Sequence, residues 1–244
     1  MNKIVVLTDI HANLSALDAV LNDIYKHYLP EGIALLGDLI DYGMRPNEVI
    51  QVIKELNIEI VCNLAGNHEK AILSDQLEHF STDRGRASLN YTKKILTPQS
   101  LFYIQNEMTE EGRIDIILSG KKVLFIHGDI DDPYWGKLTQ AKTEDLRYSC
   151  YDYVISGHTH IPHYIETFFP DNNPTMRDKN KTIFLNPGSV GQPRNHNPQA
   201  QYLYLDMHSQ TIHYNSVPYD VAEEQKLYPN YMDSFYRDRL SFGV

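Results

Sequence analysis

Near its start the chain reads Ile4-Val5-Val6-Leu7-Thr8-Asp9-Ile10-His11, an apolar run that ends abruptly in polar side chains. The β-branched residues of 4–7 and the length of the run are typical of a buried strand. Asn13 then stands where a helix N-cap belongs, and apolar residues follow at helical spacing until Pro30. A buried strand that leads directly into a helix indicates an α/β fold, with Asp9 and His11 just beyond the strand.

The same alternation continues through the first half of the chain, and the second half is richer in hairpins. Expected helices cover residues 14–28, 46–56, much of 68–108, 137–149 and 221–244. Expected strands cover residues 4–7, 33–36, 58–62, 114–118, 123–126, 153–156, 164–169, 182–185, 202–206 and 211–216, with an exposed loop at 171–180. This order predicts two sheets packed face to face, with helices outside. No repeat or linker divides the chain, so we expect a single domain over residues 1–244.

The composition argues against several classes of function. The chain has 244 residues, of which 42% are hydrophobic, and a formal net charge of -10. Because phosphate backbones are held mainly by Lys and Arg, this acidic balance argues against a nucleic-acid polymer as partner. No apolar run approaches the roughly 18 residues of a membrane span, and the start of the chain is too briefly apolar for a signal peptide. Two cysteines far apart in the chain indicate no disulfide framework. We therefore expect a cytoplasmic protein that contacts no membrane.

Candidate metal ligands stand just beyond the predicted strands. They are Asp9, His11, Asp38, Asn67, His127, His158 and His160. In open α/β sheets ligands bind in the crevice beyond the carboxyl ends of the strands, so we expect these side chains to converge in space. Glycines adjoin most of them and are expected to allow the tight turns that aim the ligands into the crevice: Gly37, Gly66, Gly128 and Gly157.

The chemistry of this set indicates divalent metal ions. Carboxylates, imidazoles and one amide, with no thiolate, suit Mn, Fe, Zn or Mg better than a structural zinc knot. The ligands outnumber the needs of one tetrahedral ion, so two neighbouring metals that share a carboxylate are expected. Such a pair clamps a phosphoryl group and lowers the pKa of a bridging water, which supplies a hydroxide nucleophile near neutral pH.

Five motifs, in their order, resemble those of the calcineurin-like metallophosphoesterase superfamily: Asp9-x-His11, Gly37-Asp38-x-x-Asp41, Gly66-Asn67-His68-Glu69, His127-Gly128 and Gly157-His158-Thr159-His160. The segment Asn186-Pro187-Gly188-Ser189-Val190-Gly191-Gln192-Pro193-Arg194 further resembles the compact prokaryotic branch, whose members are called phosphodiesterase-like or diadenosine-tetraphosphatase-like. The resemblance implies a four-layer α/β/β/α sandwich of two mixed sheets with flanking helices. It also implies two divalent metal ions, with Mn²⁺ expected first and Fe, Zn, Ni or Mg as alternatives.

The resemblance also assigns a role to each motif residue. One metal would be held by Asp9, His11, Asp38 and His160, and the other by Asp38, Asn67, His127 and His158, so that Asp38 bridges the two. His68 would be the general acid that protonates the leaving oxygen, and Asp41 would orient it. Arg194 either contacts a phosphate of the substrate or is an ordinary surface arginine.

The predicted function is that of a dinuclear metal-dependent phosphoesterase. Its substrate would be a small phosphomonoester, phosphodiester or nucleotide, attacked by a hydroxide that bridges the metals, with His68 as general acid. One alternative is a dinucleoside polyphosphate (Ap4A-type) hydrolase, which needs cationic groups for several phosphates, and the sequence offers only Arg194 and Arg45. The other alternative is a non-catalytic interaction scaffold on the same fold, which would be expected to lose ligands or His68. A homo-oligomer is compatible with each of these three functions.

Three features depart from the family or lie outside its motifs. The protein Ser/Thr phosphatase branch has an arginine after the second aspartate, whereas this chain has Tyr42-Gly43, which argues against a phosphoprotein substrate. The acidic run at 129–133 either selects against highly anionic substrates or is a solvated loop. Six histidines outside the motifs are expected to be surface or structural residues: His27, His79, His163, His196, His208 and His213.

Overall fold

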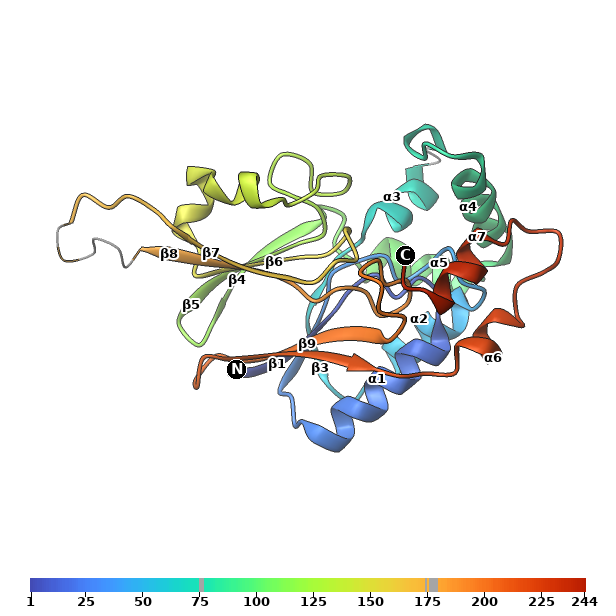
Figure 1. Ribbon diagram of the computed structural model, residues 1–244, viewed down its shortest axis with the longest axis horizontal. Helices are drawn as coiled ribbons and strands as arrows, with labels where there is room; N and C mark the ends of the chain where they lie inside the picture. Colours follow the sequence, from blue (N-terminus) through green and yellow to red (C-terminus); the bar gives the residue numbers. More distant parts are fainter. Residues whose placement is uncertain (75–76, 174, 176–179) are drawn as a thin grey trace.

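The first sheet is built around β1 (Lys3–Leu7), in which every side chain from Ile4 onward is completely buried. Figure 1 shows the computed structural model, which describes residues 1–74, 77–173, 175 and 180–244. Strand side chains alternate between the two faces. Ile4 and Val6 therefore pack against the second sheet, while Val5 and Leu7 pack against helices. Burial on both faces explains why this run is apolar at every position.

Both sheets have five strands and both are mixed. The first has the order β10-β9-β1-β2-β3, in which β1, β2 and β3 are parallel. Its other strands are β2 (Gly32–Leu35), β3 (Glu59–Asn63), β9 (Ala200–Asp206) and β10 (Thr211–Val217). The second has the order β4-β5-β6-β8-β7, in which β5, β6 and β8 are parallel. Its strands are β4 (Arg113–Leu118), β5 (Lys121–Ile126), β6 (Tyr153–Ser156), β7 (His163–Phe168) and β8 (Lys181–Asn186).

Three apolar clusters define the layers. The inner cluster, which includes Ile4 and Val6, lies between the sheets. The second cluster, which includes Val5 and Leu7, lies between the first sheet and its helices. These helices are α1 (Leu14–His27), α2 (Pro46–Lys54), α3 (Asn67–Ser74), α4 (Asp83–Ile95) and α5 (Pro98–Asn106). The third cluster covers the outer face of the second sheet through Leu138, Tyr148 and Tyr151. The predicted α/β sandwich of two mixed sheets with flanking helices is confirmed.

The segment that covers the second sheet differs from its prediction. Residues 137–149 form two 3₁₀ helices, η2 (Gln140–Glu144) and η3 (Leu146–Cys150), and not one α-helix. The buried side chains of the segment are Leu138, Thr143 and Tyr148. Their spacing of five residues does not fit the three-to-four-residue period of an amphipathic α-helix.

The tail at 221–244 folds back on the body as expected, but it forms short helices instead of one long helix. They are α6 (Val221–Gln225), α7 (Phe235–Asp238) and the 3₁₀ helix η5 (Arg239–Ser241). Pro229 lies between α6 and α7, where its ring prevents a continuous helix.

Part of the predicted loop at 171–180, namely positions 174 and 176–179, lies outside the described residues. Across the ranges that the structure describes, no helix combines the length and apolar character needed to cross a membrane.

Candidate metal centre

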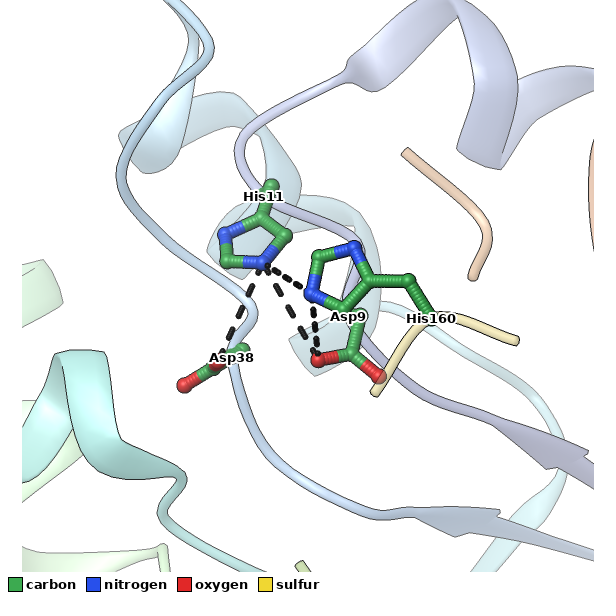
Figure 2. A group of neighbouring side chains, drawn as sticks. All are labelled: Asp9, His11, Asp38 and His160. Carbon is green, nitrogen blue, oxygen red and sulfur yellow. Dashed lines mark hydrogen bonds and ion pairs between the residues drawn. The ribbon is translucent and has the colours of Figure 1, made fainter. Parts of the chain in front are cut away.

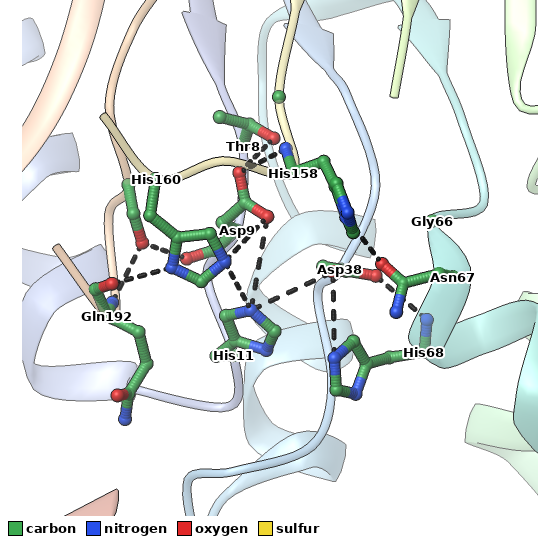
Figure 3. Close-up of polar contacts among 12 residues, drawn as sticks. Thr8, Asp9, His11, Asp38, Gly66, Asn67, His68, His158, His160 and Gln192 are labelled. Atoms are coloured by element: carbon green, nitrogen blue, oxygen red, sulfur yellow. Dashed lines mark hydrogen bonds and ion pairs between the residues drawn. The ribbon is translucent and has the colours of Figure 1, made fainter. Parts of the chain in front are cut away.

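Loops that follow five parallel strands bring the predicted metal ligands to one end of the sandwich (Figure 3). The strands and the ligands after them are β1 with Asp9 and His11, β2 with Asp38, β3 with Asn67, β5 with His127, and β6 with His158 and His160. Three of these strands belong to the first sheet and two to the second. The ligands thus meet where the carboxyl ends of both sheets lie together, as the sequence predicted.

Most of these ligands have a left-handed backbone conformation. Their φ angles are 53° at Asp9, 48° at His11, 53° at Asp38, 63° at His158 and 59° at His160. Residues other than glycine rarely adopt this region, and each instance costs about 1–3 kcal/mol. The sharp turns therefore lie at the ligand residues themselves. Contacts with the surrounding structure must offset the cost of this backbone conformation.

The neighbouring glycines have a different role from the one expected. Of the four glycines named from the sequence, only Gly37 has a positive φ, of 92°. Gly66 instead provides room, because a Cβ atom there would lie 2.2 Å from Oδ1 of Asp38. The expectation that all four glycines form the turns was wrong, since close approach of the loops also demands glycine.

The first group of ligands consists of Asp9, His11, Asp38 and His160, and all four are buried (Figure 2). Nε2 of His11 is 3.2 Å from Nε2 of His160 and 3.9 Å from Oδ1 of Asp9. Nε2 of His160 is 3.2 Å from the same Oδ1. Oδ2 of Asp38 lies 3.8 Å from Nε2 of His11. One ligand atom from each residue lies within 4.8 Å of the others.

Hydrogen bonds on the far side of the rings determine what faces the centre of this group. Nδ1 of His11 lies 3.1 Å from the carbonyl oxygen of Ile40, and Nδ1 of His160 lies 2.6 Å from that of Gln192. Because a carbonyl only accepts, each Nδ1 carries the proton and each Nε2 of the neutral ring presents a lone pair. Oδ1 of Asp9, which faces both rings, has no hydrogen-bond donor among the described residues. The three acceptor atoms, Nε2 of His11, Nε2 of His160 and Oδ1 of Asp9, thus face one another with no proton between them. This arrangement fits a bound cation.

The second group consists of Asp38, His127 and His158, joined by the amide of Asn67. Nε2 of His127 is 3.3 Å from Oδ2 of Asp38 and 3.0 Å from Oδ1 of Asn67. Nδ1 of His158 is 3.0 Å from the same amide oxygen. Nδ1 of His127 donates to the carbonyl oxygen of Leu36 at 2.7 Å, which leaves its Nε2 to face the group. Asp38 belongs to both groups, as a bridging carboxylate must.

Burial and neighbouring charges shift the pKa values within the cluster in opposite directions. Burial holds the pKa of His11 and of His160 well below the usual range and lowers that of His158 to about 3. At His127 burial also lowers the pKa, but the Asp38 charge outweighs it and raises the value to about 9. Burial raises the pKa of Asp38, yet the charge of His127 and other imidazoles holds it well below its usual range. The centre is thus an ionised carboxylate that attracts positive charge.

His68 lies beside the shared carboxylate and is held from behind by Asp41. Its Nδ1 is 2.6 Å from Oδ2 of Asp41, and its Nε2 is 3.9 Å from Oδ2 of Asp38. Burial lowers the pKa of His68, but the charges of Asp38 and Asp41 raise it above the usual value. Oδ1 of Asp41 accepts from the hydroxyls of Ser88 at 2.7 Å and Thr92 at 2.9 Å, both on α4. Sequence analysis missed these two hydroxyls, because nothing in the chain marks α4 as a neighbour of the motifs.

Glu69 closes the third motif, and sequence analysis gave it no role. Its completely buried carboxylate accepts four backbone N–H groups. Oε2 accepts from Asp38 at 2.9 Å and Gly66 at 2.8 Å, and Oε1 accepts from Leu39 at 2.8 Å and Ile40 at 3.1 Å. Burial and then the Asp38 charge raise the pKa of Glu69 to about 7. The side chain therefore ties the loop of the shared ligand to the loop of the third motif.

A cleft of about 250 Å³ opens beside the centre. It is lined by residues outside the motifs and by five motif residues: Asp38, Asn67, His68, His158 and His160. That volume lies below the roughly 300–1,000 Å³ of pockets that enclose drug-sized ligands. Phe80 packs edge-on against His68, with ring centroids 5.0 Å apart, and His79 stacks on Trp135 at 5.2 Å. His79, expected outside the site, thus lines the cleft together with Phe80 and Trp135.

The two arginines considered from the sequence have different surroundings. Arg194 lines the cleft, and its backbone N–H donates to the carbonyl oxygen of His160 at 3.2 Å. Arg45 forms an ion pair with Glu224 and donates to the hydroxyl of Ser15 at 2.7 Å. Its guanidinium is engaged within the protein, so the expectation that Arg45 serves a substrate phosphate loses its support.

The acidic run at 129–133 is neutralised within its own part of the chain. Asp129 pairs with Lys142 and also accepts backbone N–H groups from Asp131 at 2.9 Å and Asp132 at 3.0 Å. Asp131 in turn pairs with Arg147 at 2.6 Å. These contacts favour the loop interpretation over a barrier against anionic substrates.

Comparison with known proteins agrees with this geometry. A family model, the calcineurin-like phosphoesterase superfamily domain, matches residues 2–210. The chain belongs to this superfamily. It is 31% identical over 250 residues to an uncharacterised protein of Methanocaldococcus jannaschii, MJ0912, with 99% of this chain and 98% of that protein covered.

Two solved structures resemble this superfamily member along nearly their whole length. A metallophosphoesterase from Sphaerobacter thermophilus is 28% identical with a TM-score of 0.76, covering 99% of this chain and 100% of that chain. The hypothetical protein PH1004 of Pyrococcus horikoshii OT3 is 19% identical with a TM-score of 0.80, covering 100% of this chain and 99% of that chain. The second likeness shows the fold alone.

Proposed function

We propose that the protein is a dinuclear metal-dependent phosphoesterase that hydrolyses small phosphomonoesters, phosphodiesters or nucleotides. The observation that carries this proposal is the first ligand group, where the lone pairs of His11 and His160 face each other beside a carboxylate oxygen of Asp9 that has no donor among the described residues. Membership of the calcineurin-like phosphoesterase superfamily supports the reaction class.

The metal ligands fit two divalent ions, of which Mn²⁺ is the first to be expected. One would be held by Asp9, His11, Asp38 and His160, and the other by Asp38, Asn67, His127 and His158. When bound, the ions supply charge neutralisation of the phosphoryl group and activation of a water molecule near neutral pH. The left-handed backbone at most of these residues holds the ligands preorganised, so that little rearrangement is needed on binding.

The remaining chemistry belongs to the chain. His68 donates the proton of its Nε2 to the leaving oxygen, because Asp41 holds Nδ1 and the neighbouring carboxylates raise the pKa of the ring, which favours its protonated form. Ser88 and Thr92 fix Asp41 and thereby the angle of the ring. Arg194, which lines the cleft, contacts a phosphate oxygen of the substrate.

The test is a metal-resupply experiment. Metal-stripped protein is reloaded with Mn²⁺, the bound metal is counted, and hydrolysis of bis(p-nitrophenyl) phosphate, p-nitrophenyl phosphate and diadenosine tetraphosphate is measured. We expect His68→Ala to keep the metal and lose about 10²- to 10⁴-fold in kcat, and Asp38→Asn to lose metal as well. His208→Ala, at an exposed histidine, is the control and should match the unmodified protein. Stoichiometric metal without turnover of any substrate would favour the scaffold alternative, and absence of bound metal would overturn the centre itself.

A further inference from the structure

Three aromatic side chains line the cleft beside the metal centre and have no part in the proposed chemistry. They are His79, Phe80 and Trp135, which together form an aromatic wall. The ring of Trp135 stacks on that of His79, with centroids 5.2 Å apart, and meets the ring of Phe80 nearly at a right angle at 5.3 Å. Trp135 is half-buried and His79 is exposed, whereas Phe80 is buried. The wall is thus continuous and accessible from the cleft.

The aromatic wall lies on the side of the centre from which the leaving group departs. Phe80 packs edge-on against His68, the residue that would protonate the leaving oxygen, with ring centroids 5.0 Å apart. Trp135 also approaches His158, with ring centroids 6.5 Å apart. Figure 3 shows His68 and His158 on the same side of the centre, away from His160. The part of a substrate attached to the leaving oxygen therefore emerges against the wall.

The loop after β5 fixes the position of Trp135. The carboxylate of Asp132 accepts the backbone N–H of Trp135 at 3.0 Å, and the carbonyl oxygen of Asp132 accepts that of Gly136 at 3.0 Å. Asp129 is completely buried and accepts the N–H of Asp132 at 3.0 Å. The acidic run at 129–133 thus shapes the turn that presents Trp135 to the cleft. A ring that is held in place in this way loses little conformational entropy when it binds a ligand.

The chemistry of the wall suits the part of a substrate that is not phosphate. Phosphoryl oxygens bind to cations and to N–H or O–H donors, which aromatic rings do not supply. Aromatic side chains do bind nucleobases, because every base offers the face of a planar ring. Trp135 is reached from His68 through Phe80, so it suits a ring that a spacer separates from the leaving oxygen. The pentose of a nucleotide is such a spacer.

We propose that the aromatic wall binds the base of a nucleotide whose phosphate is positioned at the metal centre, with Trp135 as the principal contact. This inference rests on the proposed function and narrows its substrate class from small phosphoesters to nucleotides in which the base belongs to the leaving group. A sugar phosphate fits the same centre but lacks this contact.

The competing explanation is that the aromatic wall only shields His68 from water and supports its ring. A shield would affect every substrate to a similar extent, whereas a base contact affects only ligands that carry a base. The decisive quantity is therefore the preference for AMP over ribose 5-phosphate, since these two compounds differ by the adenine base.

The first arm of the experiment measures binding of adenosine and of ribose in the presence of Mn²⁺. Neither compound carries a phosphate, so no turnover interferes. Trp135 is the only tryptophan of the chain, and its fluorescence, excited where adenine does not absorb, reports contact with the wall directly. We expect adenosine to quench this emission in a saturable way and ribose to leave it unchanged. Adenosine without effect on the emission would overturn the inference.

The second arm measures kcat/KM for AMP and for ribose 5-phosphate with Mn²⁺. We expect Trp135→Leu to lower the ratio of the two values about 10-fold, because stacking of a base on an aromatic side chain contributes roughly such a factor. Trp135→Phe keeps a ring and should keep most of the ratio. Phe102→Leu is the matched control, since this aromatic side chain on α5 is 61% exposed, and it should leave both the ratio and the quenching unchanged. An equal loss for both substrates in Trp135→Leu would show a shield and overturn the base contact.

p-Nitrophenyl phosphate distinguishes a base from a ring attached directly to the leaving oxygen. If Trp135→Leu lowers its kcat/KM as strongly as that of AMP, the wall serves any aryl ester and the nucleotide assignment is overturned. If Trp135→Leu does not fold, the quenching of the unmodified protein decides. Failure of the phosphoesterase proposal appears as no turnover of the three substrates while adenosine still quenches; failure of this inference appears as turnover without quenching.

Discussion

Replacing Glu69 by Gln tests whether one buried carboxylate holds the shared ligand in place. Each of its oxygens accepts two backbone N–H groups, including those of Asp38 and Gly66. Glutamine keeps one oxygen and converts the other into an NH₂ donor, so two of the four N–H groups lose their acceptor. Hydrogen bonds to a charged group are worth about 1.5–3 kcal/mol each. The free energy of unfolding should therefore fall by about 3–6 kcal/mol, out of a total that is typically about 5–15 kcal/mol.

The assay is urea unfolding of metal-free protein at pH 8. Glu69 is mostly ionised at this pH, because pH 8 lies above its raised pKa of about 7. Affinity for Mn²⁺ should fall in parallel, since the backbone of Asp38 is released. Glu223→Gln is the control, because this glutamate is exposed and its pair with Lys226 on the surface contributes at most about 1 kcal/mol. A loss below about 1 kcal/mol for Glu69→Gln, together with unchanged Mn²⁺ affinity, would refute the reasoning.

Three further outcomes follow from the structure. Gly66→Ala should weaken Mn²⁺ binding by about 10- to 100-fold, measured by titration, because its Cβ atom would lie 2.2 Å from Oδ1 of Asp38; unchanged affinity would show that the loop can move aside. Ser88→Ala should lower kcat by about 10-fold with little change in KM, since Asp41 keeps only part of its support and general acids supply about 10²- to 10⁴-fold in full. Burial lowers the pKa of His163 to about 4, so between pH 6.5 and 4 the unfolded chain binds a proton that the folded chain does not. Stability should fall as the pH falls through that window, by up to about 3 kcal/mol, and His163→Gln should show a smaller dependence in urea unfolding.

The convergence of the ligands was predictable because it depends on a simple rule of topology. Parallel strands present their carboxyl ends at one edge, so motifs that each follow an apolar run must meet there. Local signals near these runs were also reliable. Asn13 caps α1 by accepting the N–H of Ala16 at 3.1 Å, as its position before a helical apolar pattern indicated.

Residues that support the centre from other elements were not predictable in the same way. Ser88 is an ordinary residue within a helix, and its contact with Asp41 depends on how α4 packs against the second motif. Tyr236 lies in a tail whose sequence carries no periodic pattern, so its place in the lining of the cleft depends on tertiary packing alone. The left-handed turn at His158 was unforeseen because the neighbouring Gly157 was expected to form the turn.

The strand order of the first sheet has a consequence for how the protein is made. β1 lies between β2 and β9, and β9 begins only at Ala200, after every strand of the second sheet has been passed along the chain. During synthesis one side of β1 therefore stays without its partner until the second sheet has emerged. Pairings between such distant segments are slow to form. His160, in the loop that follows β6 of the second sheet, must also be in place before Asp9 and His11 have a complete set of partners. We therefore expect a growing chain to bind metal late. A molecule with metal in the centre would then be one in which both sheets have already formed.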